Sequence, residues 1–197
     1  YAEMRGRIKE ADVSAPVKDG PYEYYRRTRA GEDYPVFCRK KAGAPIETAE
    51  ETLLDVNVLA KGQPYFSVPA IVPSPDHKWI AYPVDTQGRR FYTWRFKNLE
   101  TGKDADDRIE SVTPNLVWGS DSRTVFYTAQ NPDTLRSDRI YKRELGKAGD
   151  TLLMFEEDET FSLGLYPALT KKWIFIEVES TLSTEIRSHH PEAAIVL

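Results

Sequence analysis

Residues Ser74 to Lys103 read SPDHKWIAYPVDTQGRRFYTWRFKNLETGK and carry the signals of a β-hairpin. A Ser-Pro-Asp turn precedes the apolar run WIAYPV at residues 79–84, and a loop rich in turn-forming residues separates this run from FYTWRF at residues 91–96. From Tyr92 onward aromatic and polar side chains alternate, which is the period of a half-buried strand and not of a helix. We therefore predict that residues 79–84 pair antiparallel with residues 91–96.

The same pattern returns at three other places in the chain. Residues 124–129 (TVFYTA) and 139–145 (RIYKREL) follow a Gly-Ser-Asp-Ser turn and form a second predicted antiparallel pair. Two further hairpins share this form: WIFIEV (173–178) with EIRSHH (185–190), and YEYYRRT (22–28) with YPVFCRK (34–40). A period of roughly 45 to 50 residues that carries about four strands is typical of β-propeller blades.

The repeats predict an all-β fold, a partial β-propeller of about three and a half four-stranded antiparallel blades. Residues 1–16 are expected to form an arm or a short helix before it. The expected blades span residues 17–60, 61–112, 113–158 and 159–197. The fourth blade is incomplete, because its outer strand would begin only at residues 193–197, where the sequence ends. Since propellers close with four to eight blades, we expect the chain to be a fragment of a larger ring.

The outer strands are the least regular part of the pattern. Residues 107–112 and 151–156 are expected to supply them in the second and third blades. LLDVNVLA, which begins at Leu53, fits either an outer strand or a helical turn, and a strand followed by a turn is favoured.

Composition agrees with a globular domain. The chain has 197 residues, of which 40% are hydrophobic and 12% aromatic, enough to bury a substantial core. Its net charge of -4 comes from scattered residues, so we expect neither a nucleic acid nor a membrane partner. Cys38 is the only cysteine, which excludes an intrachain disulfide and suits a reducing cytoplasm.

A search for catalytic and ligand-binding motifs nominates no catalytic, cofactor-binding or metal-binding residue. The chain has no nucleophile elbow, dinucleotide fingerprint, phosphate loop or His-Glu-x-x-His motif. His189 and His190 are adjacent and would point to opposite faces of a strand, while His77 lies in a turn. The acidic run at residues 156–159 is expected to be a solvated turn between blades, and Cys38 a packed core residue and not a reactive thiol.

Aromatic residues recur at strand spacing and could form a ligand platform. They are Trp79, Tyr92, Trp94, Phe96, Trp118 and Trp173. At this spacing such residues more often fill the core between blades, and we expect them there.

Several short motifs, in this order along almost the whole chain, resemble the N-terminal propeller of oligopeptidase B (protease II), a family of the prolyl oligopeptidase clan of serine peptidases. They are MRGRIKE (4–10), KDGPYEYY (18–25), LLDVN (53–57), YFSV (65–68), SPD (74–76), DRIE (107–110) and RTVFYT (123–128). The resemblance implies a seven-bladed propeller over an α/β-hydrolase domain, which cleaves short peptides after Lys or Arg. The propeller would restrict access to the active site.

In that family the Ser, Asp and His triad lies in the hydrolase domain, which is absent from this chain. No position here matches the catalytic motif, so no catalytic residue is carried over and the 197-residue chain alone is expected to be inactive. Two alternatives stay open: the propeller of a post-proline oligopeptidase of the same clan, and a non-enzymatic propeller that serves as an interaction scaffold.

Overall fold

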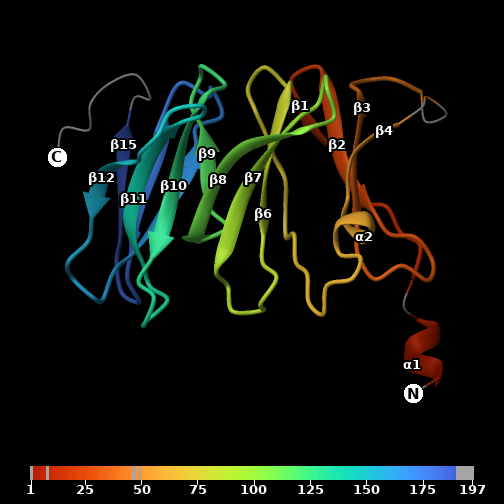
Figure 1. Ribbon diagram of the computed structural model, residues 1–197, viewed down its shortest axis with the longest axis horizontal. Helices are drawn as coiled ribbons and strands as arrows, with labels where there is room; N and C mark the ends of the chain where they lie inside the picture. Colours follow the sequence, from red (N-terminus) through yellow and green to blue (C-terminus); the bar gives the residue numbers. More distant parts are fainter. Residues whose placement is uncertain (1, 8, 46–47, 49, 190–197) are drawn as a thin grey trace. The chain divides into compact units, whose positions relative to one another are not determined.

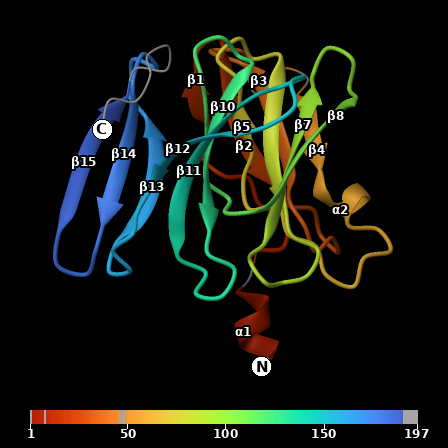
Figure 2. The same ribbon diagram turned by 60° about the vertical axis from the view of Figure 1, so that its left-hand side comes forward.

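The structure, a computed structural model, describes residues 2–7, 9–45, 48 and 50–189. Two compact units divide the chain: unit 1 is Tyr1–Pro64 and unit 2 is Tyr65–Leu197. Almost all regular structure in both is antiparallel β-sheet (Figures 1 and 2).

Unit 1 contains one four-stranded sheet with its strands in chain order. A short helix, α1 (Ala2–Gly6), precedes it, and the strands are β1 (Val17–Asp19), β2 (Tyr22–Arg27), β3 (Val36–Lys41) and β4 (Glu51–Asp55). The predicted first hairpin is confirmed, with Tyr25 opposite Cys38. The predicted strand and turn at LLDVNVLA are confirmed as β4 and the one-turn helix α2 (Val56–Leu59), which Asp55 caps by accepting from the Asn57 N–H.

Unit 2 contains three sheets that follow one another along the chain. The first joins β5 (Val72–Pro73), β6 (Trp79–Val84), β7 (Tyr92–Asn98) and β8 (Asp104–Val112). The second joins β9 (Leu116–Trp118), β10 (Thr124–Gln130), β11 (Ser137–Glu144) and β12 (Thr151–Phe155). The third joins β13 (Ser162–Pro167), β14 (Ile174–Glu179) and β15 (Thr184–His189).

Both predicted pairings in unit 2 are confirmed. Strands β6 and β7 are antiparallel with Ala81 opposite Phe96, and β10 and β11 are antiparallel with Tyr127 opposite Tyr141. Strand β8 begins three residues before the predicted start, at Asp104. The third sheet has three strands among the described residues, and the outer strand predicted at residues 193–197 lies outside them.

Apolar side chains fill the space between the first and second sheets of unit 2. The buried set is Ala81, Trp94, Phe96, Ile109, Val112, Leu116, Trp118, Val125, Tyr127 and Ala129. Phe96 and Trp118 meet edge to face, with ring centroids 5.8 Å apart, and the Trp118 indole N–H donates to the Val72 carbonyl at 2.9 Å. One indole therefore joins the two sheets through packing and a hydrogen bond.

The structure confirms most of the predicted aromatic core and corrects one member of it. Trp94, Phe96 and Trp118 are buried, Trp79 packs against their cluster, and Tyr92 is half-buried. Trp173 was expected between blades, but it precedes β14 and is 44% exposed. The residues of β14 that enter the core next to the second sheet are Ile174, Ile176 and Val178. Trp173 is out of phase with this alternation, which explains the error.

Equivalent aspartates organise the turns before β6 and β10. The Asp76 carboxylate accepts from the Ser74 hydroxyl and the Lys78 N–H, and the Asp121 carboxylate accepts from the N–H groups of Arg123 and Thr124. Burial raises the pKa of both carboxyls, but these hydrogen bonds outweigh it and hold each pKa below its usual value. The repeated Ser-Asp signal of the sequence is thus a repeated turn structure.

Candidate functional site at the hairpin-loop edge

One edge of unit 2, the loop edge, carries the loops of the three central hairpins and the connections from one sheet to the next. It comprises the hairpin loops at residues 85–91, 131–136 and 180–183 and the connections at residues 113–115 and 156–161. Figure 1 draws these segments at the lower ends of the strands of unit 2. Binding residues concentrate in loops that a rigid scaffold holds, so the loop edge is the part of unit 2 best suited to carry a binding site.

A buried carboxylate shapes the loop at residues 85–91. The Asp85 side chain is 1% exposed, and its Oδ1 accepts from the N–H groups of Gln87 at 2.7 Å and Gly88 at 2.9 Å. Its Oδ2 accepts from the Arg90 N–H at 3.0 Å. Arg90 has a φ of 63°, a left-handed conformation that a non-glycine residue keeps only when its surroundings impose it. Asp85 therefore fixes the loop from inside.

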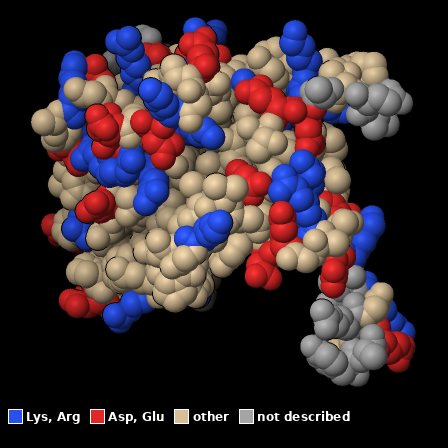
Figure 3. All heavy atoms as spheres, turned by 45° about the vertical axis from the view of Figure 1, so that its right-hand side comes forward, with Lys and Arg blue, Asp and Glu red and all other residues tan. Residues whose placement is uncertain are grey.

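This fixed loop presents two arginine side chains to solvent. Arg89 and Arg90 are both exposed. No ion pair or side-chain hydrogen bond of either guanidinium is found in the part of the chain that the structure describes. Two free guanidinium groups on a fixed backbone form a local positive site. Figure 3 shows one face of the molecule, on which basic and acidic side chains lie interspersed.

The loop at residues 131–136 is organised by Asn131. Its side-chain oxygen accepts from the N–H groups of Asp133 at 2.9 Å and Thr134 at 3.1 Å, and its own N–H donates to the Arg136 carbonyl at 2.7 Å. Leu135 has a φ of 61° and is 42% exposed. The loop thereby exposes an apolar side chain while its backbone polar groups remain satisfied.

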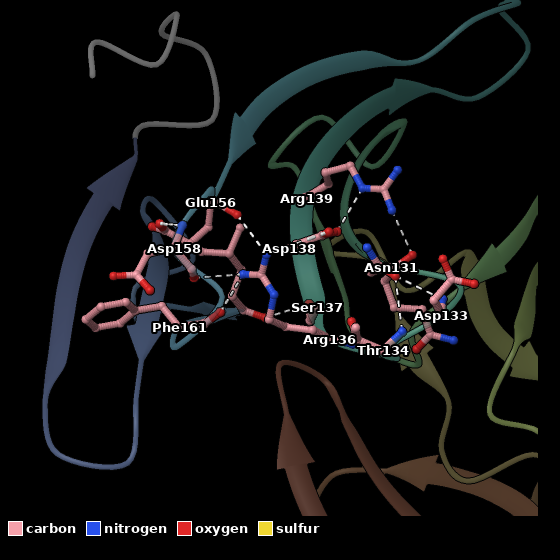
Figure 4. A network of polar contacts seen from close by, with 12 residues as sticks. Asn131, Asp133, Thr134, Arg136, Ser137, Asp138, Arg139, Glu156, Asp158 and Phe161 are labelled. Carbon is pink, nitrogen blue, oxygen red and sulfur yellow. Dashed lines mark hydrogen bonds and ion pairs between the residues drawn. The ribbon is translucent and has the colours of Figure 1, made fainter.

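Arg136, at the end of this loop, points inward. Its Nη1 donates to the carbonyls of Phe161 at 2.7 Å and Asp158 at 3.1 Å, and its Nη2 donates to the carbonyl of Glu156 at 3.1 Å. Figure 4 shows the guanidinium among these three carbonyls. Its side chain is 13% exposed. Arg136 thus fastens the connection at residues 156–161 to strand β11.

Three hydrogen bonds link the loops and the strand behind them. The Gln130 side-chain amide donates to the Arg90 carbonyl at 2.9 Å, and Gln130 is buried. The Arg139 guanidinium donates to the Gln130 carbonyl at 2.8 Å and to the buried carboxylate of Asp138, also at 2.8 Å. The two loops are therefore held in a fixed relation to each other.

A depression of about 340 Å³ lies between these loops. It is lined by Gly88, Arg89, Arg90, Phe91, Pro132, Asp133 and Leu135. The lining combines two cationic groups, one carboxylate and an apolar surface, which is a chemistry suited to a small anionic ligand with an apolar part.

Unit 1 has a depression of about 390 Å³ with a different charge arrangement. Two of its three basic residues are neutralised, because Lys9 pairs with Asp12 at 3.1 Å and Arg27 pairs with Glu50 at 2.5 Å, which leaves Arg26 as the third. Paired cations attract an additional anion weakly, so the depression on the loop edge of unit 2 is the stronger candidate.

The cysteine, the histidine and the acidic run for which no catalytic or binding role was predicted have structural roles in the fold. Cys38 is fully buried, as expected of a packed core residue, and burial raises the pKa of its thiol. His189 is buried and meets Phe126 edge to face, whereas His190 lies outside the described residues. Residues 156–159 form the expected turn between sheets, and the structure adds that Arg136 holds their backbone.

Within the described ranges, no group of three or more His, Cys, Asp or Glu side chains is arranged to hold a metal ion. No helix in these ranges has the length and apolar character needed to cross a membrane.

Comparison with protein families and curated proteins gives consistent matches. Residues 1–193 match the model of the prolyl oligopeptidase N-terminal β-propeller domain. The chain is 41% identical to dipeptidyl aminopeptidase BI of Pseudoxanthomonas mexicana over 95% of its own length and 28% of that protein. It is 30% identical to Protease 2 of Moraxella lacunata over 94% of its own length and 28% of that protein. The chain thus spans less than a third of these relatives.

Solved structures agree with the sequence comparison. Oligopeptidase B from Leishmania major superposes with a TM-score of 0.90 at 30% identity and covers 97% of this chain, which corresponds to 27% of that protein. Oligopeptidase B from Trypanosoma brucei, in a closed form with covalently bound antipain, gives a TM-score of 0.87 at 28% identity, with 97% of this chain and 27% of that protein covered. Each of the four sheets is therefore a propeller blade.

Proposed function

Because the chain belongs to the prolyl oligopeptidase N-terminal β-propeller family, we propose that it is part of the propeller of a serine oligopeptidase that hydrolyses short peptides after Lys or Arg. The observation that carries this proposal is the match over residues 1–193, supported by a TM-score of 0.90 to an oligopeptidase B. The preference for Lys or Arg rests on the resemblance to oligopeptidase B.

The proposed parent protein pairs a seven-bladed propeller with a C-terminal α/β-hydrolase domain that carries the Ser-His-Asp triad. This chain would supply blades at residues 17–60, 61–112, 113–158 and 159–197, after the arm at residues 1–16. The propeller excludes folded proteins from the triad by covering it and admits short peptides. The proposed location is the cytoplasm, which suits a chain whose single cysteine is a buried free thiol.

In unit 1 the arm before β1 approaches its blade at the end that carries the hairpin loop between β2 and β3. The arm before β1 lies beside the end of β2, where the Ser14 N–H donates to the Arg26 carbonyl and the Thr28 N–H donates to the Asp12 carbonyl. Residue 28 begins the loop between β2 and β3, so the chain enters this blade at its hairpin-loop end.

The test is hydrolysis of a blocked fluorogenic peptide with two basic residues by the purified full-length protein. We expect cleavage after Lys or Arg and loss of activity with a serine-directed inhibitor, whereas the 197-residue chain alone should give no turnover. A preference for cleavage after proline, or no peptidase activity, would overturn the proposal.

A second candidate activity is the release of dipeptides from a free N-terminus. It is favoured by the 41% identity to a protein named dipeptidyl aminopeptidase BI. A matched pair of substrates that differ only in an acetyl group on the N-terminus distinguishes the two activities. Equal turnover of both supports the oligopeptidase, and turnover of the free amine alone supports dipeptide release.

A further inference from the structure

We propose that Arg89 and Arg90 bind the C-terminal carboxylate of a short peptide, whose last side chain packs on Phe91, Pro132 and Leu135. This inference rests on the proposed function, because it assigns a peptide-binding role to the depression on the loop edge. It makes the carboxyl end of the substrate a recognition element in addition to the bond that is cleaved.

The first argument is that the two guanidinium groups are presented by a fixed loop. Asp85 holds the backbone through three N–H groups, and Gln130 anchors the Arg90 carbonyl from the neighbouring hairpin. A cation carried on a fixed backbone loses less freedom when a ligand binds than a cation on a mobile loop. The backbone of the site is therefore preorganised, while the two arginine side chains can orient toward a ligand.

The second argument is the match between the lining and a peptide end. A guanidinium binds a carboxylate through two parallel N–H groups, and the two arginines can offer this arrangement. Asp133, the one carboxylate in the lining, reduces the charge of the two arginines to a net +1. This charge suits a single carboxylate better than a doubly charged phosphate.

The third argument is the apolar part of the depression. Phe91 is half-buried and Pro132 and Leu135 are exposed, so they can take an apolar side chain without a change in the core. A C-terminal residue carries its carboxylate and its side chain on the same Cα, which fits a site where cationic and apolar groups adjoin. An acidic side chain within a longer peptide does not combine the two groups in this way.

The test measures binding to the full-length protein of dye-labelled Gly-Gly-Gly-Leu with a free carboxylate and of the same peptide as its amide, by fluorescence anisotropy at low salt. Neither peptide contains Lys or Arg. We expect the carboxylate to bind roughly five to ten times more tightly, with a smaller difference at high salt. A third peptide, Gly-Gly-Glu-Leu amide, separates an internal acid from a terminal one and should bind like the simple amide.

Three variants make the result specific. R89A/R90A should abolish the preference for the carboxylate, and R89K/R90K should retain part of it because the charge remains while the planar fork is lost. R123A, which removes an exposed arginine from the opposite end of β10, should leave the preference unchanged.

Equal binding of the acid and the amide, or a preference that survives R89A/R90A, would overturn the inference. Tight binding of the internal glutamate peptide would also overturn it. Because no peptide needs to be cleaved, the outcome is separate from that of the proposed function. A peptidase without carboxylate preference contradicts only this inference, and carboxylate binding without peptidase activity contradicts only the proposed function.

Discussion

The loops at residues 85–91 and 131–136 occupy the same position in successive blades and use arginine in opposite ways. In the first loop a buried aspartate satisfies the backbone, and Arg89 and Arg90 point to solvent. In the second loop Asn131 satisfies the backbone, and Arg136 turns inward to three carbonyl groups. A repeated fold therefore offers equivalent loops, one of which carries the connection to the next blade while the other remains available for a ligand.

The largest effect is expected from R136M, which keeps the aliphatic stem and removes the guanidinium. Three carbonyl groups lose a charged donor, so the local free energy of opening at residues 156–161 should fall by about 2–4 kcal/mol. Hydrogen exchange of the full-length protein measures this through the Phe161 N–H, which donates to the Asp158 carbonyl. The matched control is R123M, and a similar loss of protection in both variants would contradict the assigned role of Arg136.

A smaller effect is expected from D85N. The amide keeps one acceptor oxygen but loses the charge and the second acceptor, so the loop should lose about 1–2 kcal/mol of local stability. The exchange rates of the Gln87, Gly88 and Arg90 amides should rise, while those of the loop at residues 131–136 stay close to the original values. Unchanged exchange at these three amides would show that Asp85 does not shape the loop.

The smallest effect concerns pH and the turn before β10. Hydrogen bonds hold the pKa of Asp121 below its usual value in the folded state, against the effect of burial. A carboxyl with a lowered pKa stabilises the fold above the pKa of the unfolded chain, and this contribution is lost as the pH falls through the folded pKa. Thermal unfolding at pH 6 and pH 3 should therefore show a smaller decrease in stability for D121N than for the natural protein. An equal decrease in both proteins would show that Asp121 does not contribute to the pH dependence of stability.

The sequence was sufficient to predict the hairpins because their information is local. Short apolar runs located β6 and β10, alternation with a period of two located β7 and β11, and the Ser-Asp turns located the starts of β6 and β10. Strand ends were less certain, as the early start of β8 at Asp104 shows, because a strand ends where its partner ends and not at a fixed residue type.

The candidate site could not be predicted from the sequence because its interactions are not local. Arg89, Arg90 and Arg136 look alike in the sequence, as basic residues in polar loops. Only the fold brings the carbonyls at residues 156–161 to Arg136 and leaves the other two arginines facing solvent. The usable local signal was Asp85 followed by turn-forming residues, which indicates an organised loop but not what the loop presents.

The most direct test of this division of roles measures R89A/R90A beside R136M in one hydrogen-exchange experiment on the full-length protein. We predict that R89A/R90A changes the local free energy of opening by less than about 0.5 kcal/mol at both loops, because exposed side chains without partners contribute little to stability. R136M should lower it by about 2–4 kcal/mol at residues 156–161. The opposite order, with R89A/R90A the more destabilising variant, would contradict the account.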